Sequence, residues 1–184
     1  IKKVKKFIYA SSSSIYGDTK LYPFNEKDYK NSPISVYGAT KLSNEIIAQS
    51  YVKNFKLKCV GLRFFTVYGP YGRPDIAYYS FLDNLRNRKK ITVFNKGEMK
   101  RDFTYIDDVV DILLKLKIQK YNTNQIYNIC GNRPIYIKKL VDYLTKKTNF
   151  KNVQNVKHSS YEVFKTHGKN SKIIKITKFN KFSD

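Results

Sequence analysis

The sequence predicts an α/β fold with a doubly wound, mostly parallel sheet and a smaller second α/β region. Two observations predict it. Short β-rich runs alternate with helical patterns along most of the 184 residues, and the segments between them are rich in glycine, proline and hydroxyl side chains. Strands that alternate with helices are typical of parallel sheets whose faces the helices cover.

The first elements surround a loop of small polar residues. Residues 4–10 end in a β-rich run and predict a strand, and the serine-rich residues 11–17 predict the loop that follows it. Residues 34–55 have a helical pattern, with Ser35 as the N-cap. One apolar stripe runs along this helix and comprises Leu42, Ile46, Ile47 and Tyr51.

The rest of the chain continues the alternation as far as about residue 150 and shows little periodicity beyond it. A buried strand over 59–65 is predicted to run into a Gly/Pro-rich loop over 67–74. The elements predicted after that loop are helices over 77–88, 107–116 and 137–148 and strands over 91–94 and 125–129.

The composition excludes several classes of protein. With 41% hydrophobic residues the chain can bury a core, and no apolar run approaches the roughly 18 residues of a membrane span. The first ten residues lack the apolar core of a signal peptide. Two cysteines, Cys59 and Cys130, are too few for a disulfide framework and are expected to be buried thiols. These features predict a cytoplasmic protein without a membrane partner.

No metal site is predicted. The two histidines, His158 and His167, have no acidic or thiol neighbours at the spacing of metal ligands. Both are expected to lie on the surface.

The net charge of +22 raises the alternative of a basic module that binds polyanions. Only six of the 36 basic residues are arginines, whereas base recognition and phosphate forks favour arginine, and the lysines are spread along the chain. Half of the residues are Lys, Asn, Ile, Tyr or Phe, whose codons are rich in A and T, so a coding bias explains the charge. No specific nucleic-acid partner is therefore predicted.

A tyrosine and a lysine at the start of the helix over 34–55 are the first candidates for chemistry. Tyr37 and Lys41 are four residues apart and share one helix face. A nearby ammonium lowers the pKa of a phenol, which makes a tyrosine usable as an acid or base at neutral pH. Spacing alone is weak, because the chain holds four Tyr-x-x-x-Lys pairs. Tyr37 differs from the others in following a strand and a hydroxyl-rich loop.

Two further segments carry polar groups near strand ends. The four serines at 11–14 follow the first strand, where open α/β sheets place ligands, although such runs are also common in flexible loops. Residues 62–75 pass from a strand into a glycine-containing loop. Arg101 stands between a turn and a helix, where it suits a phosphate fork or a pair with a nearby acid.

Taken together, these motifs resemble one family in order and spacing. They are Ser-Ser-Ser-x-x-Tyr-Gly, Tyr-x-x-x-Lys, Leu-Arg-Phe-Phe-Thr-Val-Tyr-Gly-Pro-x-Gly-Arg-Pro-Asp and Arg-Asp-Phe-Thr-Tyr-Ile-Asp-Asp. Over residues 1 to about 150 the chain resembles the extended short-chain dehydrogenase/reductase family of NAD-dependent nucleotide-sugar epimerases and dehydratases. The resemblance implies a Rossmann-like sheet and epimerisation at C4 of a UDP-sugar through a 4-keto intermediate. Within the family the chain is most similar to the 4-epimerases of UDP-glucuronate.

The resemblance also implies a role for each matching residue. Tyr37 would move the O4 proton, Lys41 would bind the nicotinamide ribose, and Ser12 would hydrogen-bond O4. The resemblance thus implies that all three residues are catalytic and that all three also contact NAD. Phe64 and Phe65 would lie beside the nicotinamide. The residues implied to bind the substrate are Arg101 at the diphosphate, Thr92, Val93 and Phe94 at the uracil, and Ser13, Ser14, Thr66 and Arg73 at the sugar and its carboxylate.

Two observations narrow the reaction and the substrate that the resemblance implies. By resemblance, dehydratases and decarboxylases carry an acid where this chain has Ser13 and Ser14, which favours simple epimerisation. Galactose-type epimerases usually carry Asn where Thr66 stands and lack the Gly-Pro-Tyr-Gly-Arg-Pro that follows, which favours the uronate substrate. The alternatives left open are a 4-epimerase of UDP-glucose or UDP-N-acetylglucosamine, a dehydratase of the same family, an inactive fragment and a basic polyanion-binding module.

One fingerprint of the family is absent from these 184 residues. No two of the eight glycines are separated by a single residue, so the chain has no G-x-G-x-x-G motif to hold a cofactor pyrophosphate. We therefore expect a fragment that is poorly active alone. In this fragment, residues 1–75 would be what remains of the NAD-binding domain, and residues 76–184 would be mostly the substrate-binding region. Within the second range, residues 101–130 would belong to the NAD-binding domain again. Family members commonly dimerise through helices, so the full-length protein is expected to be a homodimer.

Overall fold

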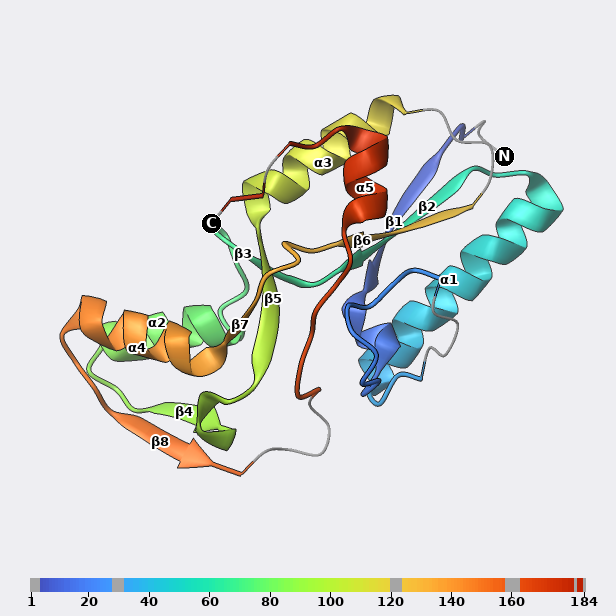
Figure 1. The fold of residues 1–184 in the computed structure, drawn as a ribbon. Coiled ribbons are helices and arrows are strands. Elements are labelled where there is room, and N and C mark those ends of the chain that lie inside the picture. Colours follow the sequence, from blue (N-terminus) through green and yellow to red (C-terminus); the bar gives the residue numbers. More distant parts are fainter. Residues whose placement is uncertain (1–3, 28–31, 120–123, 158–162, 181, 184) are drawn as a thin grey trace.

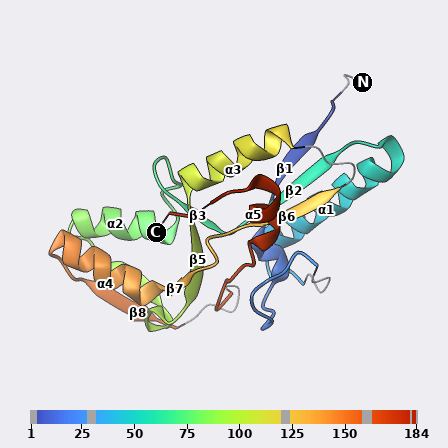
Figure 2. The same cartoon turned by 45° about the horizontal axis from the view of Figure 1, so that its top comes forward.

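A computed structural model gives the fold and describes residues 4–27, 32–119, 124–157, 163–180 and 182–183. A parallel sheet with helices on both faces adjoins a smaller α/β region, and a third, short sheet lies between the two (Figure 1). The view in Figure 2 separates α2, α4 and β8 at one end from α1 and β1 at the other.

The main sheet has three parallel strands, in the order β1 (Phe7–Ser12), β2 (Cys59–Phe64) and β6 (Gln125–Ile129). Its register pairs Ser12 with Phe64 and Phe64 with Ile129, so the three strands end at one edge. The helices that flank this sheet are α1 (Val36–Phe55) on one side and α3 (Ile106–Ile118) and α5 (Ser171–Thr177) on the other.

The two faces of the main sheet differ in chemistry. Val60 and Leu62 of β2 pack into an apolar cluster with Ile112 of α3 and Ile173 of α5. Because side chains alternate along a strand, Arg63 points to the opposite face, toward α1. That face carries a buried polar network around Arg63.

The smaller region is a layer of two helices on a two-stranded parallel sheet. Its elements are α2 (Ala77–Arg86), β4 (Ile91–Phe94), α4 (Ile137–Thr148) and β8 (Val153–Val156). Phe81, Leu85, Val93, Val141 and Leu144 form its apolar cluster. The sheet between the two regions comprises β3 (Thr66–Tyr68), β5 (Lys100–Tyr105) and β7 (Pro134–Tyr136).

The predicted α/β class is confirmed, and so are most of the elements. The strands over 91–94 and 125–129 and the helix over 137–148 have the predicted bounds. The first strand lies at Phe7–Ser12 instead of 4–10. The prediction missed five elements, namely β3, β5, β7, β8 and α5. β3, β7 and β8 have only three or four residues, and all four of the missed strands depend on pairing with distant segments, which local periodicity does not encode.

The apolar stripe predicted for α1 is present, but most of it does not face the core. Ile46, Ile47 and Tyr51 are each more than half exposed. The helix instead buries Gly38, Glu45 and Ala48 against the sheet. The sequence pattern located the helix, and Leu42 of the stripe packs against a core cluster, but a carboxylate, Glu45, occupies the buried position of the next turn.

Both cysteines are buried and unpaired, as predicted. Within the part of the chain that the structure describes, no helix is long and apolar enough to cross a membrane.

Candidate active site

The serine-rich loop after β1 forms a tight turn at the carboxyl edge of the main sheet. Residues Ser13–Tyr16 make a single 3-10 turn, η1, and Ser12 caps it: the Ser12 Oγ accepts from the Ser14 N–H at 3.1 Å. The Ser12 hydroxyl donates to Ser14 Oγ, also at 3.1 Å. Ser11 and Ser12 therefore end β1, and Ser13 and Ser14 begin a hydrogen-bonded turn.

Helix α1 presents Tyr37 and Lys41 beside that turn. Ser35 caps the helix, as predicted, by accepting from the Gly38 N–H at 3.0 Å. The Lys41 ammonium lies 5.6 Å from the centroid of the Tyr37 ring and donates to the Ala10 carbonyl at 3.2 Å. Tyr37 is 53% exposed, and its side chain lines a cavity. The phenol and the ammonium are thus adjacent and accessible to a ligand.

The cavity that Tyr37 lines is about 640 Å³ in volume and brings together side chains from four other segments. The predicted site residues that also line it are Phe65, Thr66, Arg73, Thr92, Phe94 and Arg101. Residues 66–101 are far from Tyr37 in sequence, so only the packing of the smaller region against the main sheet creates this space.

Lys41 lines a separate cavity of about 530 Å³ beside β1, and two of the predicted residues point away from the site. Val93 is 3% exposed and belongs to the apolar cluster of the smaller region, because β4 alternates and sends only Thr92 and Phe94 outward. Phe64 packs against the α3 side of the main sheet. Phe65, its neighbour, turns to the other side and joins a cluster with Tyr16 and Phe24.

The charged side chains that line the large cavity are Arg73, Arg101 and Asp75, so positive charge exceeds negative charge there by one. Arg73 forms a bidentate pair with Asp75, with Nε 3.0 Å from Oδ1, and its guanidinium is mostly exposed. Arg101 donates to the backbone carbonyls of Lys100 and Phe164 at 3.0 and 3.4 Å, which aims its guanidinium along the cavity wall. Two guanidinium groups at one cavity suit an anionic ligand.

A second hollow of about 230 Å³ shares Thr66 and Arg101 with the large cavity. Ser13, Ser14 and Thr166 line it as well. Sequence reasoning missed Thr166, because its segment has no recognisable pattern. Its Oγ1 accepts from the Asp102 N–H at 3.0 Å.

Residues 163–170, which we call the strap, carry Thr166 across the site. The Thr166 N–H donates to the Lys100 carbonyl at 3.1 Å, and the Gly168 N–H donates to Asp102 Oδ2 at 2.9 Å. On the other side Phe24 exchanges backbone hydrogen bonds with His167 and Lys169 at 2.7 and 2.9 Å. The strap therefore joins β5 to the loop after β1.

Behind the site, Arg63 and Glu45 form a buried ion pair. Arg63 Nε and Nη2 donate to the two Glu45 carboxylate oxygens at 2.9 and 2.8 Å. The Ser11 hydroxyl donates to the same carboxylate at 2.6 Å. Burial lowers the pKa of Arg63, but the hydrogen bonds and charges of Glu45 and Tyr16 together outweigh burial and raise that pKa overall. This fork ties α1 to β2 and β1 one helical turn below Lys41.

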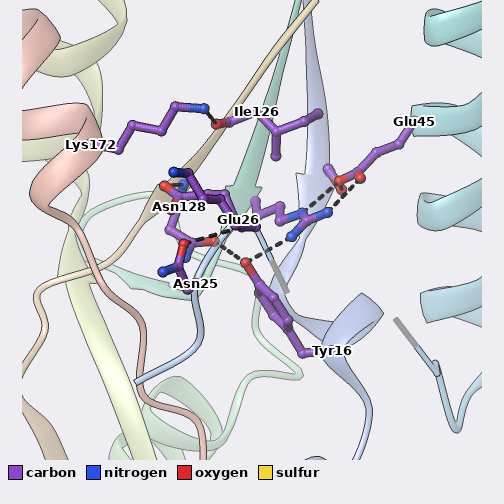
Figure 3. Close-up of polar contacts among 10 residues, drawn as sticks. Tyr16, Asn25, Glu26, Glu45, Ile126, Asn128 and Lys172 are labelled. Atoms are coloured by element: carbon purple, nitrogen blue, oxygen red, sulfur yellow. Dashed lines mark hydrogen bonds and ion pairs between the residues drawn. The ribbon is translucent and has the colours of Figure 1, made fainter. Parts of the chain in front are cut away.

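The network continues from Arg63 through Tyr16 to Asn128 (Figure 3). Arg63 Nη1 donates to the Tyr16 hydroxyl at 2.8 Å, and that hydroxyl donates to Asn128 Oδ1 at 2.7 Å. Burial raises the pKa of Tyr16 to about 12, against the opposing effect of Arg63, so the phenol keeps its proton at neutral pH. Asn128 Nδ2 donates to the Phe24 and Lys169 carbonyls at 2.9 and 3.3 Å.

Asp102 gives the site a pH-dependent contribution to stability. Burial raises its pKa to about 6, while the backbone N–H groups of Gly168 and the 131–133 loop oppose the shift. At pH values between the pKa of 3.8 in the unfolded chain and the pKa of about 6 in the native protein, the folded protein binds more protons than the unfolded chain. The unfolding free energy therefore falls as pH rises through this range. We expect the unfolding free energy of the wild type, relative to Asp102→Asn, to fall by about 2 kcal/mol from pH 4 to pH 7 in denaturant titrations. A pH-independent difference would contradict the assignment.

Comparison with known proteins identifies the family. A family model described as "NAD dependent epimerase/dehydratase family" matches residues 1–130. The chain belongs to the NAD-dependent epimerase/dehydratase family. An uncharacterised protein of Methanocaldococcus jannaschii is 47% identical over 152 residues, which are 80% of this chain and 46% of that protein. UDP-glucuronate 4-epimerase 5 of Arabidopsis thaliana is 43% identical over 78% of this chain and 36% of its own length.

A solved structure of the epimerase/dehydratase family has the same fold. The UDP-glucuronic acid 4-epimerase of Bacillus cereus, in complex with UDP-glucuronic acid and NAD, has a TM-score of 0.91 and 33% identity. The match covers 99% of this chain and 58% of that one. The chain therefore spans about half the length of the relatives it matches.

The donors that α1 presents in this epimerase-family chain suit the hydroxyl groups of a sugar, such as a ribose of NAD. The Tyr37 phenol and the Lys41 ammonium are adjacent donors at an accessible helix face. The Ala10 carbonyl accepts a hydrogen bond from one of the three ammonium protons. Ribose hydroxyls accept such donors. The residues that hold a pyrophosphate in a G-x-G-x-x-G loop are not among these 184 residues.

Proposed function

We propose that the protein containing this chain is a 4-epimerase of UDP-glucuronate, which it interconverts with UDP-galacturonate. The observation that supports this most strongly is the shared cavity of Tyr37, Thr66, Arg73 and Arg101, next to the capped serine turn. Residues 1–75 contribute the acid–base helix together with Thr66 and Arg73, and residues 76–184 contribute Thr92, Phe94 and Arg101. Family membership makes nucleotide-sugar chemistry the starting point, and the cationic cavity suits a nucleoside diphosphate with a second anionic group.

In the proposed reaction Tyr37 is the acid–base residue. Its phenol oxygen takes the proton from the sugar O4 and later returns it, while the Lys41 ammonium beside the ring stabilises the phenolate. Ser12 sits at the strand end, and its hydroxyl, once turned away from Ser14, would hydrogen-bond O4 without transferring its proton. When bound, NAD supplies the redox chemistry of the family, the removal and return of a hydride at C4.

The remaining polar groups orient the substrate. Arg101 suits the diphosphate, and Thr92 and Phe94 on the outer face of β4 suit the uracil. Thr66 together with Ser13 and Ser14 offers hydroxyls to the sugar. Among the described residues that line the smaller hollow there is no carboxylate, which favours epimerisation over the acid-assisted chemistry implied for dehydratases.

The proposal is tested with the product of the complete reading frame that contains this chain. UDP-glucuronate and NAD⁺ are added, and the anomeric signals of the two UDP-uronates are followed by NMR. We expect both epimers at equilibrium, starting from either one. Conversion of UDP-glucose but not UDP-glucuronate would overturn the substrate, and conversion of neither would overturn the function.

The choice of a uronate depends on Arg73. Its exposed guanidinium already pairs with a carboxylate, that of Asp75, so a substrate carboxylate can replace Asp75 as partner. We expect Arg73→Ala to raise KM for UDP-glucuronate by about tenfold or more. Arg86→Ala, which removes an exposed arginine at the end of α2, is the matched control and should leave KM unchanged. An equal rise of KM in both variants would show that Arg73 does not bind the substrate carboxylate.

The exposed stripe of Ile46, Ile47 and Tyr51 on α1 supports a homodimer of the full-length protein. A second copy that covers this stripe would remove three large apolar side chains from water. In such a dimer the helix that carries Tyr37 would be held from both sides.

A further inference from the structure

The buried network behind the site connects two segments that reach it from opposite directions. One is α1, whose second turn carries Lys41 and whose third carries Glu45. The other is the strap, whose Thr166 lines the smaller hollow. Between them run four side chains, Glu45, Arg63, Tyr16 and Asn128, in unbroken hydrogen-bond contact at 2.7 to 2.9 Å.

Every member of this chain of contacts has its polar atoms matched. Tyr16 accepts one proton and donates another, and Asn128 uses both of its amide N–H groups on the Phe24 and Lys169 carbonyls. Arg63, Tyr16 and Asn128 are each at most 3% exposed. In a low-dielectric interior a fully satisfied polar network specifies one arrangement, because any shift leaves a buried group unpaired.

We propose that Glu45, Arg63, Tyr16 and Asn128 form a positioning relay that holds the acid–base helix in register with the strap. Tyr16 is its central positioning residue, because among the contacts of the described residues its hydroxyl joins the Arg63–Glu45 half to the Asn128–strap half. Through it the Tyr37 phenol is set relative to the sugar pocket. The effect on catalysis rests on the proposed function, whereas the mechanical link does not.

Tyr16→Phe cuts the relay with the least damage to the core. The ring stays stacked on Phe24 at a centroid distance of 4.6 Å, and only the hydroxyl is lost. Tyr22→Phe is the matched control, since Tyr22 also stacks on Phe24 and its hydroxyl also bonds the strap, at the Lys165 carbonyl, 3.3 Å away. Tyr22 has no hydrogen bond to Arg63 among the contacts of the described residues.

The first measurement is hydrogen exchange without ligand on the complete protein. In Tyr16→Phe we expect the amides of residues 36–48 to exchange about tenfold faster, because Arg63 loses a buried partner, while α2 and α4 keep wild-type rates. In Tyr22→Phe residues 36–48 should match wild type. Equal rates for 36–48 in the two variants would overturn the relay, whether or not the protein is an epimerase.

The second measurement separates positioning from a merely structural role. At a temperature where both variants are folded, Tyr16→Phe should lower kcat for UDP-glucuronate about tenfold and change KM less than about twofold. The reason is that Arg73 and Arg101, which bind the substrate, are not carried by α1. Faster exchange with unchanged kcat would overturn the positioning role. A wild type without epimerase activity would overturn the proposed function and leave exchange to decide the relay.

Discussion

Tyr37→Phe is expected to lower kcat for epimerisation by about a thousandfold or more, with little change in fold or stability. The phenol oxygen is the proposed acid–base atom, and general acid–base groups contribute up to roughly four orders of magnitude to a rate. The side chain is 53% exposed, so removal of its hydroxyl leaves no buried group unpaired. Steady-state kinetics on UDP-glucuronate, with circular dichroism for the fold, measures both.

Helix α4 offers a matched control for this substitution. Lys147 lies 5.7 Å from the centroid of the Tyr143 ring, against 5.6 Å for Lys41 and Tyr37, and Tyr143 is similarly exposed. Tyr143→Phe therefore repeats the chemistry of the change away from the proposed site and should keep wild-type kcat. If Tyr37→Phe retained activity, or if both variants lost it equally, the acid–base role of Tyr37 would be wrong.

Glu45→Ala is expected to lower the unfolding free energy by about 3–5 kcal/mol, which is a large part of the stability of a typical domain. The substitution leaves the buried Arg63 guanidinium without its counter-ion and the Ser11 hydroxyl without its acceptor. It also frees α1 from β2. Urea or thermal denaturation of the variant and the wild type measures the loss.

Two comparisons isolate the buried ion pair. Glu98→Ala breaks an ion pair of the same 2.7–2.8 Å length with Lys138, but both of those side chains are about half exposed, so stability should hardly change. Glu45→Gln keeps the shape and the acceptor oxygen and should fall between wild type and Glu45→Ala. A small effect of Glu45→Ala would show that the pair is dispensable to the fold.

Local patterns in the chain were enough for the elements whose signals lie within a few residues. The helix over 137–148 and the strands over 91–94 and 125–129 have the predicted bounds, and Ser35 caps α1 as predicted. The adjacency of Tyr37 and Lys41 follows from helix geometry alone. Their role in catalysis stays a prediction until the variants are measured.

Other features required the folded chain. The strap and β8 are short segments whose partners, β5 and β4, lie some sixty residues away in sequence. Thr166 entered the site only through this pairing. The apolar stripe on α1 gave no sign that Glu45 is buried. The cost of burying this carboxylate is offset by its ion pair with an arginine 18 residues away, which no local periodicity reveals.

By itself the sequence determined the α/β class, the long elements, the family resemblance and the helix that carries Tyr37 and Lys41, because these depend on spacing and on residues close together in the chain. The tertiary structure alone decided which face of α1 is buried, which residues share the cavity, and how the strap is tied to the acid–base helix. The Tyr16–Asn128 contact joins residues 112 positions apart. Such a contact exists only when the sheet, the helix and the strap pack around one desolvated network, whose polar groups must satisfy one another.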